Sequence, residues 1–106
     1  MSEHVHLIAR LVPRVGQALA LALALALALA QAMASITPAV RGEPGCLAYT
    51  AHESRERPGT IVMYEVWESQ AALDVHADGP NFRALAARFD ELLGEPLAIE
   101  FLHRIA

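Results

Sequence analysis

Cysteine is almost missing from this sequence of 106 residues: Cys46 is the only one, so an internal disulfide is excluded and the fold must depend on its core. Lysine is absent, and all eight basic residues are arginine, which together with abundant alanine is typical of a GC-rich genome. Charged residues make up only 19% of the chain and leave a net charge of −4. This balance excludes a disordered polyanion and gives no reason to expect nucleic acid as a partner.

The chain is long enough for one small domain and no more. A domain of this size has a thin margin of stability, so we expect homo-oligomers. Alanine and leucine are in excess: they supply 36 of the 106 positions, and 13 of those 36 form an unbroken Leu-Ala repeat from Ala18 to Ala30. This repeat inflates the 55% hydrophobic content, and the rest of the chain is ordinary for a globular domain.

The repeat is too short to cross a membrane, because its residues would cover about 20 Å of a hydrocarbon core of about 30 Å. A signal peptide is the stronger alternative, since Arg10 and Arg14 precede the repeat and a small-x-small sequence, Ala32-Met33-Ala34, follows it. The long strand-like segment 4–12 is atypical of a signal peptide. We therefore expect a cytoplasmic protein with no membrane partner, and secretion stays open as the alternative.

The repeat is instead predicted to lie in a helix over residues 17–40. Strict alternation of two residues nominally fits a strand, but alanine and leucine are strong helix formers and neither is β-branched. A core-facing stripe follows at helical spacing. Its members are Leu25, Leu29, Met33, Ile36 and Val40. The leucines Leu19, Leu21, Leu23 and Leu27 are expected to be exposed or to contact another chain.

The remaining segments alternate in a regular way. Strands are expected over residues 4–12, 46–53, 60–67 and 97–104, and helical segments over 69–76, with Ser69 as N-cap, and 81–93. The order β-α-β-β-α-β predicts one α+β domain, 1–106, with a ferredoxin-like fold. Its uncovered sheet face would carry Ile8, Val12 and Tyr64, so we expect it to pack on a second subunit.

Three motifs resemble the antibiotic biosynthesis monooxygenase family, and within it the quinol monooxygenases. They are Glu43-Pro44-Gly45-Cys46-Leu47-Ala48-Tyr49, Tyr64-Glu65-Val66-Trp67-Glu68-Ser69 and Ala72-Leu73-x-x-His76. The resemblance covers nearly the whole chain. It implies a dimeric α/β barrel that oxidises a quinol or phenolic aromatic with dioxygen as co-substrate and without metal, flavin or haem.

The sequence departs from that family in three ways. The Leu-Ala repeat makes the first helix abnormally long, by roughly two turns. Haem-degrading relatives need an asparagine on the first strand, where Ala9 stands here. Many quinol-oxidising members carry a second histidine where this chain has Asn81. The second difference argues against haem degradation.

Trp67 and His76 are the candidate catalytic residues. An electron-rich phenolate reacts with dioxygen directly, so the protein needs a base near neutral pH and a dry pocket. His76 has a suitable intrinsic basicity, and Trp67 can stack on a flat substrate or pack beside the path of oxygen. The alternative is purely structural, with Trp67 in the core and His76 beside Asp74 or Asp78 at a helix end.

The candidate substrate-binding residues are Tyr49, Leu73, Phe82, Asn81 and Phe89, although such aromatics also serve simply as core. His4 and His6 form at most a weak metal motif, so no metal is expected. Two functions follow: a cofactor-independent monooxygenase, or a non-catalytic dimeric module of the same fold that binds a small ligand or has a stress-related role. An isomerase on the same scaffold is a variant of the first.

Overall fold

The structure is a computed structural model that describes residues 3–16 and 18–106. Eight elements follow one another along the chain. They are β1 (Val5–Leu11), α1 (Leu19–Arg41), β2 (Cys46–Glu53), β3 (Ile61–Trp67), α2 (Gln70–Asp78), α3 (Pro80–Ala86), α4 (Phe89–Leu92) and β4 (Ala98–Leu102). All four strands begin and end within two residues of the ranges predicted from the sequence.

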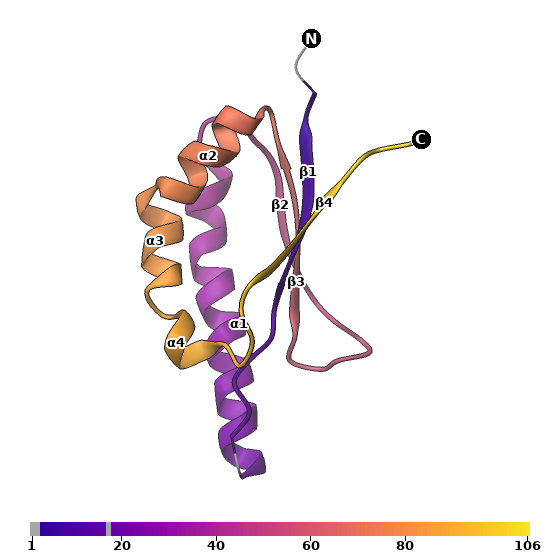
Figure 1. Cartoon of the computed structure of the whole chain (residues 1–106). Helices are drawn as coiled ribbons and strands as arrows, with labels where there is room; N and C mark the ends of the chain where they lie inside the picture. The colour runs from indigo at the N-terminus through magenta and orange to yellow at the C-terminus, as the bar shows by residue number, and fades with distance from the viewer. Residues whose placement is uncertain (1–2, 17) are drawn as a thin grey trace.

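The strands form an antiparallel sheet in the order β2-β3-β1-β4, and the helices cover one of its faces (Figure 1). The chain thus has the predicted ferredoxin-like α+β fold, with its earliest strand at an inner position of the sheet. The segment with the features of a signal peptide supplies β1 and α1, so both are integral parts of this domain.

Strand alternation explains which side chains face the helices. Leu7 and Leu11 of β1 and Met63 of β3 are almost completely buried under them. The opposite face has no helix over it, and there Ile8 pairs in register with Tyr64, whose side chain is 38% exposed. The predicted division between a core face and an open face is confirmed.

Helix α1 is the longest element, with 23 residues. Its predicted stripe is confirmed: Leu29, Met33 and Val40 are buried, and the other two members are half-buried. The N-terminal part projects beyond the sheet and the other helices, so the length added by the repeat overhangs the domain (Figure 1). The four remaining leucines of the repeat are more than half exposed there, as expected.

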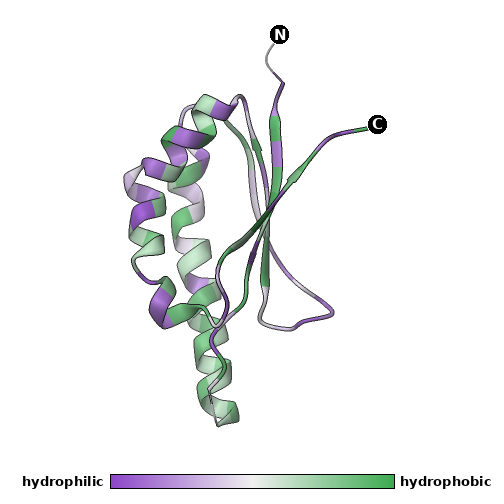
Figure 2. Ribbon diagram, in the orientation of Figure 1, coloured by the Kyte–Doolittle hydropathy of each residue, from purple (hydrophilic) through white to green (hydrophobic). Residues whose placement is uncertain are grey.

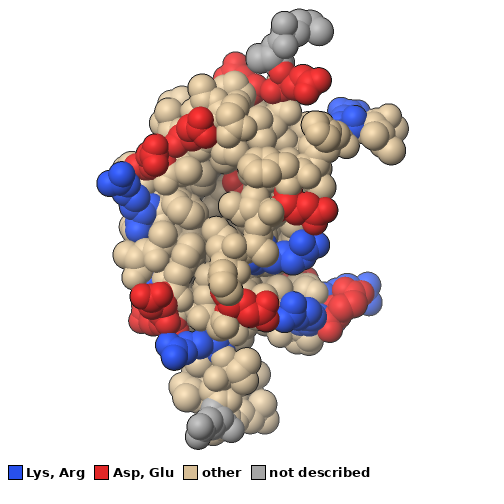
Figure 3. Space-filling model, viewed as in Figure 1, with Lys and Arg blue, Asp and Glu red and all other residues tan. Residues whose placement is uncertain are grey.

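Figures 2 and 3 show the character of this projecting end. It is hydrophobic in Figure 2 and shows no charged atoms in the view of Figure 3. By length and composition alone, α1 is the one helix among the described residues that could cross a membrane. Its C-terminal half is instead packed into the core.

One helical prediction needs correction. Residues 81–93 do not form a single helix, because the chain leaves the helix between α3 and α4. The N–H of Arg88 bonds the carbonyl of Leu85, three residues back, so the turn tightens there. The predicted N-cap of α2 is confirmed, since the Ser69 hydroxyl accepts the N–H of Ala72 at 3.2 Å.

Candidate functional site

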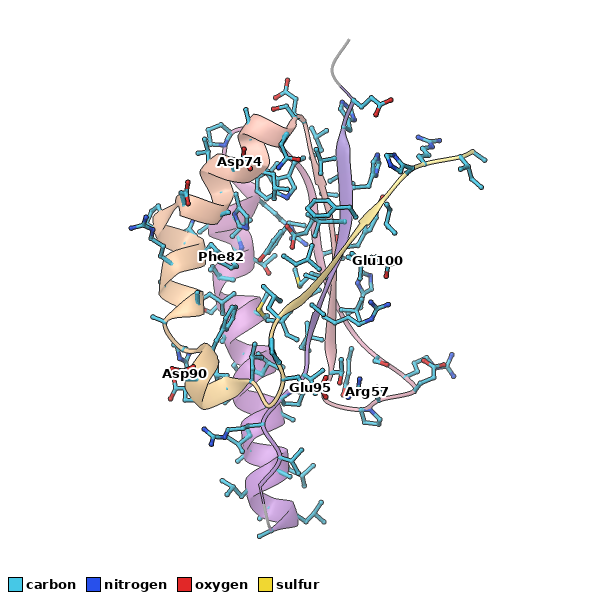
Figure 4. All side chains as sticks on the ribbon, viewed as in Figure 1. Arg57, Asp74, Phe82, Asp90, Glu95 and Glu100 are labelled. Carbon is cyan, nitrogen blue, oxygen red and sulfur yellow. The ribbon has the colours of Figure 1, made fainter. Side chains whose placement is uncertain are left out.

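A cavity lies between the sheet and helices α2 and α3. Most of its wall is apolar and comes from β1, β3, α1 and the later helices. Phe82, on α3, lies between that helix and the sheet (Figure 4). Three polar side chains join this wall: Tyr49 of β2, Glu65 of β3 and His76 of α2. We call this space the central cavity.

His76 is held from behind by a carboxylate. Its Nδ1 lies 2.8 Å from Oε1 of Glu43, which follows the C-terminal end of α1. The other oxygen of Glu43 accepts a hydrogen bond from the Asn81 amide, also at 2.8 Å. The His76 side chain is only 6% exposed, so this contact fixes the imidazole within the fold.

Aromatic rings enclose the imidazole on its other sides. Trp67 is fully buried and stacks on His76 with 4.5 Å between ring centroids and 28° between planes. The rings of Tyr49 and Phe82 approach it at 5.9 and 5.7 Å. The orientation of His76 is therefore set by packing as well as by Glu43.

Glu65 is a buried carboxyl on the same wall. It is 6% exposed and accepts a hydrogen bond on Oε1 from the indole N–H of Trp67 at 3.0 Å. Burial raises the pKa of Glu65 above its usual range, although the Trp67 bond opposes this. Burial also raises the pKa of the Tyr49 phenol, and the nearby charge of Glu65 adds to the effect.

Three atoms of the central cavity have unused hydrogen-bonding capacity. Within the described part of the chain, every fully buried side-chain nitrogen or oxygen has a hydrogen-bond partner. Oε2 of Glu65, Nε2 of His76 and the Tyr49 hydroxyl form no hydrogen bond there, so these atoms must be accessible. Because all three side chains line the central cavity, a ligand inside it can reach these atoms.

The structure brings most of the predicted site residues together. Tyr49, Leu73, Phe82 and Phe89 line the central cavity, together with His76. Trp67 and Asn81 are not part of its wall. Trp67 lies behind His76, so the ring it stacks on is the imidazole. Asn81 binds Glu43 and borders a separate groove beside α1.

Sequence reasoning missed Glu43 and Glu65 as site residues. A signal for Glu65 was present, because alternation in β3 places it on the same face as Met63 and Trp67. A carboxylate on the core side of a strand is a candidate functional group. Glu43 begins one of the family motifs, but nothing in the sequence pairs it with His76, because the two residues are 33 positions apart.

The site offers no obvious place for a metal ion. Among residues 3–16 and 18–106, no group of three or more histidine, cysteine or acidic side chains could hold one. Cys46 is half-buried, and burial raises the pKa of its thiol, which keeps it protonated and unreactive.

Comparison with known proteins gives the same fold and a family. Residues 6–88 match the sequence profile of the family described as antibiotic biosynthesis monooxygenase. The protein named "Putative monooxygenase Rv0793", from Mycobacterium tuberculosis, is 38% identical over 102 residues, which is 96% of this chain and 92% of that one. Its solved structure superimposes with a TM-score of 0.82 at 30% identity, covering 98% of this chain and 97% of that one.

Two further matches extend the comparison. The crystal structure of PA3566 from Pseudomonas aeruginosa gives a TM-score of 0.84 at 29% identity, covering 100% of this chain and 98% of that one. An uncharacterized protein of Synechocystis, sll1783, is 35% identical over 66 residues, or 62% of this chain. The match spans only 44% of the length of that relative.

Fold and site together define a small α+β domain whose buried cavity holds an oriented histidine and a carboxyl group. This chain belongs to the antibiotic biosynthesis monooxygenase family. The family and the names of the relatives indicate a monooxygenase-like function.

Proposed function

We propose that the protein is a cofactor-independent monooxygenase that oxidises a quinol or related phenolic aromatic with dioxygen. The observation that carries the proposal is the His76 imidazole, which is held at Nδ1 by Glu43, has no hydrogen bond at Nε2, and lines an apolar cavity with aromatic residues in its wall. This arrangement suits a general base in a pocket that excludes water.

His76 acts as the base in this proposal. When the Nδ1–H group of His76 donates a hydrogen bond to Glu43, Nε2 carries the free lone pair. Nε2 then takes the proton of a substrate hydroxyl. The resulting anion supplies the electrons for reaction with dioxygen. One oxygen atom enters the ring and the other leaves as water, so a dihydroxyarene becomes a hydroxyquinone with no external reductant. Phe82 and Phe89 pack against the flat substrate, and Trp67 keeps the imidazole in place.

The first test is oxygen consumption with 1,4-dihydroxynaphthalene in air. We expect a rate above the uncatalysed background, and a loss of about 100-fold or more in His76→Ala, because a positioned base contributes at least that much. His103→Ala is the matched control, since that histidine is exposed and lies outside the central cavity. A rate no higher than background would contradict the enzyme, and tight binding without turnover would support the non-catalytic binding module.

The proposal extends to the oligomeric state, the class of ligand and the location of the enzyme. The open face of the sheet, with Ile8 beside Tyr64, supports a homodimer. The cavity supports a small aromatic substrate, and neither a nucleic acid nor a membrane partner is proposed. A cytoplasmic location is supported by the use of β1 and α1 as parts of the folded domain.

A further inference from the structure

The polar atoms of the central cavity differ in whether they donate or accept hydrogen bonds, and this difference makes the cavity selective among ligands. A carboxylate only accepts hydrogen bonds, whereas a phenol both donates and accepts. Glu65 uses Oε1 for the Trp67 indole and leaves Oε2 for a ligand. The described residues that line the cavity include no arginine and no lysine. The wall therefore offers acceptors but no permanently charged cation.

We propose that Glu65 determines ligand specificity: its Oε2 accepts a hydrogen bond from a ligand hydroxyl, which makes the central cavity select neutral hydroxylated aromatics over their ethers and carboxylates. The inference rests on the proposed function, because it takes the central cavity as the substrate site. It adds a second anchor to His76, so a ligand with two hydroxyl groups meets two acceptors.

The cost of an unsuitable ligand follows from burial. An aryl ether has no proton to give, so it leaves Oε2 of Glu65 without a partner in an apolar site. An aryl carboxylate brings a second acceptor and a negative charge next to Glu65, with Glu43 behind His76 and no arginine or lysine among the described lining residues to balance the charge. Both ligands should therefore bind more weakly than the phenol, although all three are flat and of similar size.

The indole N–H of Trp67 determines how the side chain is oriented in Glu65→Gln. The N–H of Trp67 can only donate, so in Glu65→Gln the side-chain carbonyl must turn towards it. The amide NH₂ then points to the position that Oε2 held. The variant thus replaces an acceptor by a donor without changing the shape of the cavity.

The test compares equilibrium binding of 2-naphthol, 2-methoxynaphthalene and 2-naphthoate to the native protein by calorimetry under nitrogen, at a pH above the raised pKa of Glu65, where its carboxyl is ionised and only accepts hydrogen bonds. We expect 2-naphthol to bind about tenfold or more tightly than the other two, the ratio that a hydrogen bond to a charged group supports. In Glu65→Gln this preference should be lost or inverted. Tyr49→Phe is the control, because it removes a hydroxyl from the same wall and should not invert the order.

Equal binding of the three ligands to the native protein would overturn the inference without any variant, so a misfolded variant leaves the test intact. A preference that survives in Glu65→Gln would overturn it as well. The outcome is separate from that of the proposed function. Selective binding of 2-naphthol without oxidation of a quinol would contradict the oxygenase alone, and oxidation with no preference would contradict the role of Glu65 alone.

Discussion

At the scale of single residues, the least expected group is a carboxyl in an apolar wall. Glu65 is retained in a position where burial disfavours its charge, and only one of its oxygens is hydrogen-bonded. A core residue selected for packing alone would be apolar at this position. The arrangement therefore sacrifices stability for a polar atom that faces the cavity.

This cost can be measured as a pH dependence of stability. Because the pKa of Glu65 is raised above its usual 4.5, the folded state binds its proton more tightly than the unfolded state. The free energy of unfolding should therefore fall as pH rises from the usual pKa through the raised one. In Glu65→Gln this contribution is gone, so urea denaturation should show the variant gaining stability relative to the native protein over the pH interval that runs upward from 4.5 through the raised pKa.

Glu91→Gln is the matched control for that experiment, because the Glu91 side chain is 62% exposed and pairs only with Arg88 on the surface. Its stability relative to the native protein should change little over the same pH interval. A difference between Glu65→Gln and the native protein that is the same at both ends of the interval would contradict the prediction.

Single residues were predictable from the sequence where a repeating pattern or a family motif marked them. The family motif marked His76 and Trp67, and helical spacing marked Leu29. The contact of His76 with Glu43, and that of Glu43 with Asn81, were not predictable, because both join loops and helix ends whose geometry no periodicity describes. For the same reason, the sequence predicted that Trp67 could stack on a ligand, whereas the structure shows its ring stacked on the imidazole of His76.

At the scale of elements, the two ends of α1 lie in different environments. From Leu29 onwards its side chains pack into the core, while earlier turns of the Leu-Ala repeat project beyond the domain. A Leu-Ala alternation with a period of two residues cannot place all its leucines on one face of a helix with about 3.6 residues per turn. Several leucines of the repeat are therefore exposed. Composition predicted the helix, but how far it would overhang depended on packing.

Two neighbouring leucines provide a direct test of this division. Leu29 is completely buried and Leu27 is 58% exposed, on the same helix and in the same repeat. We expect Leu29→Ala to lower the free energy of unfolding by about 2–5 kcal/mol, because it leaves a cavity in the core. Leu27→Ala should change it by no more than about 0.5 kcal/mol. Chemical denaturation measures both, and equal losses would mean that the projecting part of α1 is packed in solution.

At the scale of the whole molecule, the projecting helix makes the domain elongated. Its principal extents are 52, 31 and 20 Å, and its radius of gyration is 14.4 Å. A compact chain of this length would have a radius of gyration of about 13 Å. Two apolar surfaces therefore reach solvent in one chain: the end of α1 and the open face of the sheet.

We expect the open sheet face, and not the helix end, to form the dimer. Tyr64→Arg should convert the protein to a monomer in sedimentation velocity, since it places a charge at the centre of that face, opposite Ile8. Val75→Asp is the control, because Val75 is 65% exposed on α2, on the helical side of the molecule. A stable monomer of the native protein at micromolar concentration would contradict the prediction.

The inner position of β1 also affects how the protein is made. Of the four strands, β1 is synthesised first, but its neighbour β4 is synthesised last. Until β4 arrives, one edge of β1 stays unpaired on the nascent chain, where it can associate with other chains. Variants that slow the closing of β4 onto β1 should therefore reduce the yield of folded protein in the cell, even where the finished fold is as stable as the native one.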